Sequence, residues 1–429
     1  MATSTALKYV EDNRGKLISY LQKLVRDYPE GEASLQAHLV ERFTELGCQV
    51  HVEKLLPTTV RLEKEFALPE TIDMIPRTHI IGQIKGNGGG RSLMLITHPD
   101  GDPIKTEGWV KPPHEGTIEN GKMYGWGVAD DLAGIAMMIG AVEAILTTGI
   151  KPRGDVYLMS ACAKRNAWGI AALLRLGYMA DAAIYVHPAE SELGLREIKT
   201  LTSGLLKFRI TVEGRLPPKT EFVQTTFQHL GVNSIDKAIK IILSLYDLND
   251  KRNKRVNYVP LTDSVGRSTN LLISHFQAGS MGNLTDIPTK CTIAGSITFP
   301  PPDDIDTVKN EVEIHLESHY QADSYLRENK PQIEWIQGTQ GVEIPLNHPI
   351  VEITMRALEA ETGEKPFSNP LYSKSDLRTP VLISGIPNVG IGPKAGDLAT
   401  TGGCDEWVDL DDYIRATKVL VRIITDWCA

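Results

Sequence analysis

Three short segments of the chain end in side chains that can bind a metal ion. "LITHPDGDP" carries His98 and Asp100, which are two residues apart and so point to the same side of an extended backbone. "YGWGVADDLAG" places Asp130 and Asp131 where a helix begins, and "AAIYVHP" ends its apolar run at His187. Each has a plainer alternative, since a helix can begin with an aspartate N-cap and a strand-end histidine can bond to backbone. Taken together, an imidazole, a carboxylate and a second imidazole predict a site for one divalent transition metal.

The elements that carry these segments alternate between strand-like and helix-like patterns. Strands are expected at residues 48–56, 79–86, 92–98, 155–163 and 181–188, and helices at residues 9–27, 35–46, 130–149 and 169–178. This alternation predicts an α/β fold with a mixed, mostly parallel sheet flanked by helices. In such sheets, functional groups gather at the carboxyl ends of the strands.

The pattern changes from about Leu205 onward. Strand, helix, strand, strand, helix and strand follow one another, at residues 205–214, 234–248, 268–279, 290–302, 304–320 and 332–337. This order predicts a small α+β domain of the ferredoxin-like kind. The helix-rich pattern resumes near Pro349, so the small domain is expected as an insertion. We assign residues 204–324 to the inserted domain and residues 1–203 and 325–429 to the other.

The bulk composition limits the classes of partner. The chain has 429 residues, enough for two domains, and a formal net charge of −9, which argues against nucleic acid and anionic membranes as partners. No apolar run reaches the length of a membrane span, and the N-terminal residues lack the apolar core of a secretory signal. Five widely spaced cysteines predict free thiols, so we expect a cytoplasmic protein.

Several ordered segments resemble one family of metal-dependent amidohydrolases, the family of acetylornithine deacetylase, succinyl-diaminopimelate desuccinylase, aminoacylase and carboxypeptidase G. The similarity covers nearly the whole chain, and its segments are "LMLITHPDGDP", "GTIENGKMYGWGVADDLAG", "HLGVNSIDKA", "SKSDLR", "GIPNVGIGP" and "CDEWVDLDDYIRATKVL". The second of these is the most specific. The resemblance implies a zinc-peptidase-like catalytic domain, and it implies that the inserted domain mediates a homodimer.

The resemblance also assigns roles to single residues. The family usually binds two metals, and by this alignment His98 matches the first histidine ligand and Asp130 the aspartate that bridges the metals. Asp100 matches the acid that supports the first histidine, a role that fixes the tautomer of a ligand. His187, followed by a proline, stands where the family places a later acidic ligand.

The chain departs from the family at the second metal. Ala163 and Lys164 align with the paired glutamates that serve as general base and as ligand, and Gly402 stands where the last histidine is expected, four residues before Glu406. Metal site one therefore keeps three ligands, while site two loses both of its own. We expect one divalent metal per chain, Mn or Zn first and Co or Fe as alternatives, with the ammonium of Lys164 replacing part of the lost positive charge.

The group that replaces the missing base stays open at this point. Asp131, Glu190, His229 and Asp376 are candidates, and nothing in the sequence selects one. His229 lies a few residues after the position where the family's lid domain supplies a carbonyl-polarising histidine, although it could equally be a surface histidine. In "SKSDLR", Arg378 matches a position that tends to bind a substrate carboxylate. The expected substrate-binding residues are the following: Arg378, Arg165, Ser375 and Asp376.

Three functions remain as hypotheses. The first is hydrolytic deamination of an aromatic amine, as in 5-nitroanthranilate aminohydrolase, because a ring that withdraws electrons depends less on a general base. The alternative is hydrolysis of N-acyl amino acids or small peptides, in which the amide nitrogen must be protonated before it leaves. The third is a non-catalytic relative that binds a small molecule or a partner. For both enzyme hypotheses the expected substrate is a small molecule that carries a carboxylate.

Overall fold

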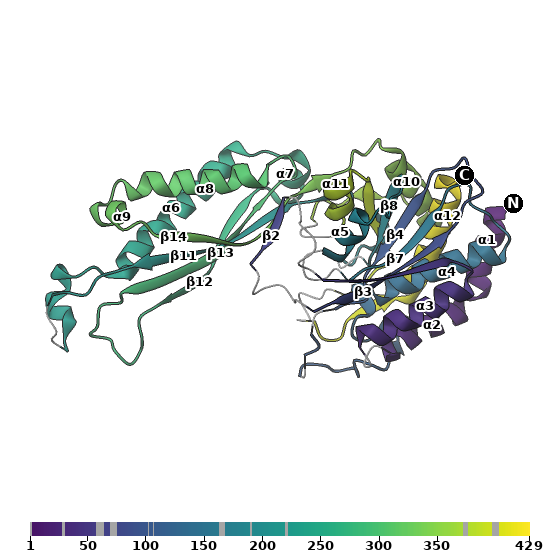
Figure 1. Ribbon diagram of the computed structural model, residues 1–429, viewed down its shortest axis with the longest axis horizontal. Coiled ribbons are helices and arrows are strands. Elements are labelled where there is room, and N and C mark those ends of the chain that lie inside the picture. The colour runs from purple at the N-terminus through teal and green to yellow at the C-terminus, as the bar shows by residue number, and fades with distance from the viewer. Residues whose placement is uncertain are drawn as a thin grey trace.

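The chain forms two lobes arranged along one long axis, with both termini in the larger lobe (Figure 1). The computed structural model describes the following residues: 2–27, 31–56, 64–68, 75–101, 103–105, 107–162, 168–188, 191–218, 222–371, 376–396 and 403–429. None of the described helices is long and apolar enough to cross a membrane. All five cysteines are free and buried, as predicted.

The larger lobe is built on a six-stranded sheet. Its strand order is β1-β3-β7-β4-β8-β17, with bounds Gln49–Leu55, Arg77–Ile84, Val156–Ser160, Leu93–Thr97, Ala182–Val186 and Asn388–Ile391. The neighbours β7, β4, β8 and β17 run parallel, whereas β3 is antiparallel to both β1 and β7. The predicted mixed, mostly parallel sheet is therefore confirmed.

Alternate residues of the central strand enter two different cores. Leu93 and Leu95 pack with the core on one face, and Met94 and Ile96 pack with the core on the other. The first face is covered by α1–α4, α10 and α12, with bounds Ala2–Asp12, Arg14–Asp27, Glu32–Glu45, Ala133–Thr147, Pro349–Thr362 and Leu410–Trp427. The second face is covered by α5 and α11, with bounds Trp168–Arg175 and Arg378–Ser384. Because all five residues of β4 are buried, the strand reads as a continuous apolar run.

The N-terminal helical segment differs from the prediction. One helix over residues 9–27 is expected from the apolar spacing, but the chain forms α1 and α2 with a break at Asn13. The Asn13 side chain donates a hydrogen bond to the carbonyl of Tyr9, a local bond that competes with regular helix. The apolar face is nevertheless as predicted, because Val10, Leu17 and Leu21 are all buried.

The smaller lobe has an antiparallel sheet in the order β12-β13-β11-β14-β2. The bounds are Asn270–Ala278, Lys290–Phe299, Gly204–Glu213, Gln332–Thr339 and Glu65–Ala67. Helices α6 (Ser234–Arg255) and α8 (Ile305–Tyr320) share a core with these strands, and the short helices α7 (Val259–Val265) and α9 (Ser324–Glu328) connect them. The order β14-β11-β13-β12 with two helices is the ferredoxin-like arrangement, as predicted.

The predicted end of the inserted domain at residue 324 needs correction. Strand β14 pairs with β11 from Leu205↔Thr339 to Thr211↔Gln332, so the sheet continues beyond that boundary. Strand β2, which comes from the N-terminal part of the chain, pairs with β14 and adds a further strand at the edge. The sequence alone did not reveal β2, because a three-residue strand carries too little pattern.

The sheet of the larger lobe brings the predicted metal ligands to one edge. The parallel strands β7, β4 and β8 are neighbours, and their carboxyl ends therefore meet. His98 directly follows β4 and His187 directly follows β8, while Cys162 lies two residues beyond β7. This arrangement places both histidines at the same end of the sheet.

Candidate metal centre

Asp130 and Asp131 lie in a π-helical turn that spans Val128–Leu132 and precedes α4. Their backbone angles are not helical, with φ −146° and ψ 75° at Asp130 and φ −143° and ψ 36° at Asp131, and the peptide bond between them is cis. The N-cap residue of α4 is Leu132, whose side chain makes no capping hydrogen bond. Neither aspartate occupies the N-cap position, although a backbone hydrogen bond from Gly134 in the first turn of α4 still acts on the Asp131 carboxyl group.

Two imidazole nitrogens and one carboxylate oxygen converge at this edge. His98 Nε2 lies 3.1 Å from Asp130 Oδ1, and His187 Nε2 lies 3.0 Å from the same oxygen. All three residues are buried: His98 is 2% exposed, Asp130 is 6% exposed and His187 is 4% exposed. Their possible ligand atoms all lie within 4.8 Å of one another. Ligand atoms of a tetrahedral site with bonds of about 2.0–2.1 Å are separated by roughly 3.3 Å, so the spacing fits one metal ion.

The protons of both imidazoles point away from this centre. His98 Nδ1 lies 2.8 Å from the backbone carbonyl of Asp100, and His187 Nδ1 lies 2.9 Å from the carbonyl of Pro188. A neutral imidazole has one N–H, and here it is placed on Nδ1, where a carbonyl accepts it. Both Nε2 atoms then face the carboxylate of Asp130, an arrangement that is favourable with a cation between them or with a further proton on the ring.

Asp100 supports His98 through its backbone and not through its carboxylate. The Asp100 Oδ1 atom is 3.8 Å from His98 Nδ1, which is too long for a hydrogen bond, whereas the carbonyl oxygen is within bonding distance. The group that bonds to His98 in this structure is therefore the carbonyl of Asp100, and the role predicted for its carboxylate stays a prediction. A backbone carbonyl fixes the ring orientation as well as a carboxylate does, and it adds no charge.

Tyr185 is a neighbour of the centre that sequence reasoning missed. Its ring stacks on His187 at 5.1 Å between centroids and on His98 at 6.5 Å, and the residue is 4% exposed. Tyr185 comes two residues before His187, so it shares a face of β8 with that histidine. The period-two pattern of the strand was the signal that could have identified it.

Asp131 anchors the strand end that carries His98. Its Oδ2 accepts a hydrogen bond of 3.3 Å from the His98 backbone N–H, and it is 1% exposed. Burial raises the pKa of Asp131 well above its ordinary value, while His98 and two backbone hydrogen bonds partly oppose the shift. A Cβ on Gly134 would lie 2.3 Å from Asp131 Oδ1 and 2.1 Å from the carbonyl of Val186, so only glycine allows this close approach.

Arg378 lies buried in an ion pair with a residue far away in the sequence. Its Nη2 and Nε lie 2.6 Å and 3.0 Å from the two carboxylate oxygens of Glu65, and Asp376 Oδ1 lies 3.7 Å from its Nη1. Burial raises the pKa of Asp376 to about 6, while Arg378 and His98 act in the opposite direction. The guanidinium predicted to bind a substrate carboxylate is thus already engaged by a carboxylate of the chain.

A half-buried carboxyl group, Glu32, interacts electrostatically with Asp100. Glu32 at the start of α3 is hydrogen-bonded by Cys162 Sγ at 2.7 Å and pairs with Arg77. Burial raises the pKa of Glu32, and the carboxylate of Asp100 contributes in the same direction. The sequence indicated neither Glu32 nor Cys162 as part of a site.

The remaining predicted residues divide into two groups. His229 lies exposed in a short turn, Gln224–Leu230, of the inserted lobe, and it does not belong to the cluster of metal-binding side chains. The others lie outside the described residues, so their positions stay predictions: Ala163, Lys164, Arg165, Glu190, Ser375 and Gly402.

Comparisons with known proteins identify the same family as the sequence motifs. The model of Peptidase family M20/M25/M40 matches residues 94–426. The N-formyl-4-amino-5-aminomethyl-2-methylpyrimidine deformylase of Halalkalibacterium halodurans is 24% identical over 444 residues, covering 98% of this chain and 96% of that one. The aminopeptidase PepT of Bacillus cereus has a TM-score of 0.70 at 18% identity, covering 97% of this chain and 99% of that one. A dinuclear metal binding peptidase of Bacillus subtilis has a TM-score of 0.63 at 16% identity, covering 97% and 98% respectively.

The cluster predicts the effect of removing one ligand. We expect His187→Ala to lower the metal content by one equivalent per chain while circular dichroism stays unchanged, since the side chain lies at a strand end and not in an apolar core. Metal per chain is measured by atomic emission after dialysis against micromolar Zn²⁺. The control is His275→Ala, an exposed histidine on β12. Equal metal content in wild type and His187→Ala would disprove the ligand assignment.

Proposed function

Because the chain belongs to the peptidase family M20/M25/M40, a family of metal-dependent hydrolases, we propose that it hydrolyses the amide bond of a small N-acyl amine. The first substrate class is an N-formyl amine. The observation that carries this proposal is the buried cluster of His98, Asp130 and His187, whose spacing suits a hydrolytic metal. A non-catalytic relative would have no need to keep three converging ligands in a buried site.

The proposed centre holds one cation, with Zn or Mn as the first candidates and Co or Fe as alternatives. Such a cation supplies Lewis acidity and makes hydroxide available near neutral pH. The Bacillus subtilis peptidase is described as dinuclear, whereas this chain has Lys164 and Gly402 where the resemblance expects ligands of the second metal. The donor set of two imidazoles and one carboxylate also matches known catalytic zinc sites that leave a position open.

The acyl substrate follows from the relatives and from the state of Arg378. The deformylase of Halalkalibacterium halodurans matches nearly the whole chain, and by its name that enzyme acts on an N-formyl amine. With both Nε and Nη2 bound to Glu65, Arg378 is poorly suited to a substrate carboxylate, so an uncharged formamide fits better than an N-acyl amino acid. The comparisons do not support deamination of an aromatic amine, the first hypothesis from the sequence, and they favour the amide alternative.

Asp376 is the described carboxyl group that best suits proton transfer. An amide nitrogen leaves only when protonated, so a group must take a proton from water and deliver it to the amine. Burial raises the pKa of Asp376 to about 6, close to neutral pH, and an electrostatic interaction with His98 supports a position near the proposed metal ligands. We propose that Asp376 takes the role of the family's glutamate, for which Ala163 offers no substitute.

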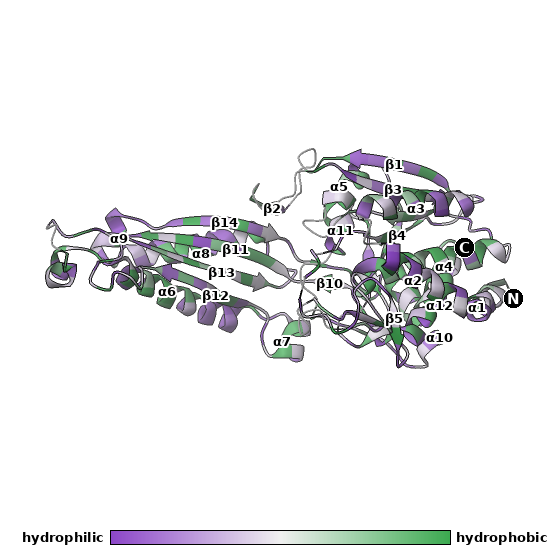
Figure 2. Cartoon of the chain, turned by 90° about the horizontal axis from the view of Figure 1, so that it is seen from below, coloured by the Kyte–Doolittle hydropathy of each residue, from purple (hydrophilic) through white to green (hydrophobic). Residues whose placement is uncertain are grey.

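The inserted lobe is proposed as the interface of a homodimer. Strand β12 is the outer strand of its sheet, and no described strand pairs with its free edge. Large apolar side chains are exposed on β12 and on the adjacent α6, which shows mixed hydropathy along its length (Figure 2): Leu272, Phe276, Ile239 and Tyr246. An exposed edge with apolar neighbours invites pairing with a second copy of the same edge.

A substrate screen tests the proposed reaction. We expect the metal-loaded protein to release formate from N-formyl aminomethylpyrimidines and to hydrolyse N-acyl amino acids more slowly. A chelator or the substitution His187→Ala should abolish this activity. Formate is measured with formate dehydrogenase, and ammonia is measured in parallel with nitro-substituted aminobenzoates. Ammonia release without any formate release would support deamination of an aromatic amine and overturn the proposal.

The pH dependence tests the role of Asp376. A base must be deprotonated, so kcat should rise with pH through about 6 and fall about tenfold per pH unit below that value. Asp376→Asn should lower kcat by about 10²–10⁴-fold and abolish this acidic limb, with metal content unchanged. The control is Asp155→Asn at the opposite end of β7. An unchanged pH profile in Asp376→Asn would remove it from the mechanism.

Sedimentation tests the dimer. Leu272→Glu puts a charge on the exposed apolar edge and should shift the protein from dimer to monomer, because a buried unpaired carboxylate opposes association. Ile314→Glu, at a similarly exposed position on α8, serves as the control and should leave the dimer intact. A wild-type monomer at micromolar concentration would contradict the proposed interface.

A further inference from the structure

The inserted lobe contains a second group of metal-type side chains, separate from the centre at the large sheet. Helix α8 carries His315 and His319 four residues apart, which places both imidazoles on one helix face. Helix α6 packs beside α8 and contributes Asp247. One possible ligand atom from each of these residues lies within 4.8 Å of those of the other two. The proposed hydrolysis uses none of the three.

The geometry of this group is close to that of a metal site. His315 Nε2 lies 3.6 Å from Asp247 Oδ2, and the two imidazole centroids lie 4.5 Å apart. Ligands of a tetrahedral Zn²⁺ are separated by roughly 3.3 Å, given bonds of about 2.0–2.2 Å. Small rotations of exposed or partly exposed side chains therefore suffice to close the site, without movement of either helix.

Hydrogen bonds already orient both rings. His319 Nδ1 donates to the carbonyl of His315 at 2.9 Å, so its Nε2 offers a lone pair. His315 Nε2 lies 2.8 Å from the carbonyl of Ser244, to which it donates in the absence of metal. Ligation through this atom moves the proton to Nδ1 and gives up that hydrogen bond. The site is accordingly weaker than the buried centre of the larger lobe.

The present partner of Asp247 does not prevent this role. Its carboxylate pairs with Lys251 at 2.7 Å, one turn along α6, and both side chains are well exposed. An exposed ion pair of this kind contributes little free energy. The usual explanation of such residues is a solvated helix face, but a solvated face does not require two histidines one turn apart beside a carboxylate of the neighbouring helix.

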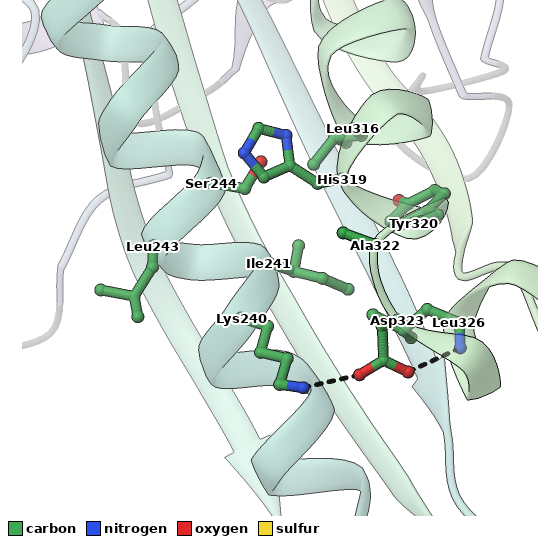
Figure 3. A pocket seen from close by; sticks show the side chains of 10 residues that line it. All are labelled: Lys240, Ile241, Leu243, Ser244, Leu316, His319, Tyr320, Ala322, Asp323 and Leu326. Atoms are coloured by element: carbon green, nitrogen blue, oxygen red, sulfur yellow. Dashed lines mark hydrogen bonds and ion pairs between the residues drawn. The ribbon is translucent and has the colours of Figure 1, made fainter.

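We propose that Asp247, His315 and His319 bind one divalent transition metal, such as Zn²⁺, Ni²⁺ or Co²⁺, which links α6 to α8. Imidazole ligands select these borderline metals over Mg²⁺ and Ca²⁺, which prefer oxygen. The position is beside a cavity of about 340 Å³ between the two helices, with His319 on its wall and the Lys240–Asp323 ion pair at the other end (Figure 3). Water or an anionic group of a ligand in this cavity completes the coordination.

Metal counting on the full-length protein tests the site. After equilibrium dialysis against micromolar Zn²⁺, wild type should hold one equivalent more than His319→Ala, His315→Ala or Asp247→Asn, measured by atomic emission. With Co²⁺, only wild type should show the additional visible absorption of a nitrogen-ligated ion. The matched controls His229→Ala and His275→Ala remove exposed histidines of the same lobe and should bind as much metal per chain as the wild type.

The outcomes separate this site from the catalytic centre. His187→Ala should lose the other equivalent and keep this one, and formate release should persist in the three cluster variants. Zn²⁺ should raise the thermal midpoint of His187→Ala but not that of the double variant His187→Ala/Asp247→Asn, since the ion links two helices. Equal metal counts in wild type and the folded cluster variants, or the same loss in His229→Ala, would overturn the proposal.

Discussion

The larger lobe depends on one electrostatic constraint, the approach of two imidazole nitrogens to a single carboxylate oxygen. With both Nδ1 protons bonded to backbone carbonyls, His98 and His187 present lone pairs to an oxygen that also carries negative charge. In a buried site such acceptors repel one another strongly, because little water is present to screen them. A bound cation would convert this repulsion into attraction, which is the physical basis for proposing the three groups as a metal site.

The choice of histidine at position 187 changes the charge of that centre. Two neutral imidazoles and one carboxylate leave a divalent ion with a net charge of +1, whereas an acid in place of His187 would neutralise it. A more positive centre polarises a carbonyl more strongly and lowers the pKa of water further. This gain offers a physical reason why a single ion would suffice where relatives are described as dinuclear.

Much of the fold could be predicted because its signals are local. Apolar runs such as Leu93–Thr97 and helical spacing such as Leu17, Leu21 and Leu24 depend on nearby residues only, and both led to correct elements. The convergence of the three candidate ligands could also be predicted, since each directly follows a strand or lies in a glycine-rich turn. The N-cap alternative for Asp130 failed because the π-helical turn after Gly127 has no comparable sequence pattern.

Pairs of residues that lie far apart in the sequence, by contrast, could not be predicted. Glu65 lies 313 residues from Arg378, in a polar stretch that contains nothing typical of a buried acid. The same holds for Glu32, which meets Cys162 across 130 residues. Only the folded chain shows that Arg378 already has a carboxylate partner, and this finding redirected the proposed substrate from a charged to an uncharged amide.

The pairing of Glu65 with Arg378 joins the two lobes of the chain. Glu65 belongs to β2, a strand from the N-terminal part of the chain that pairs with the sheet of the smaller lobe. Arg378 is the first residue of helix α11 in the larger lobe. Removal of the smaller lobe would therefore leave β2, and with it the Glu65 carboxylate that pairs with the buried guanidinium, without its sheet. Although inserted in sequence, the smaller lobe is therefore not an independent unit of the fold.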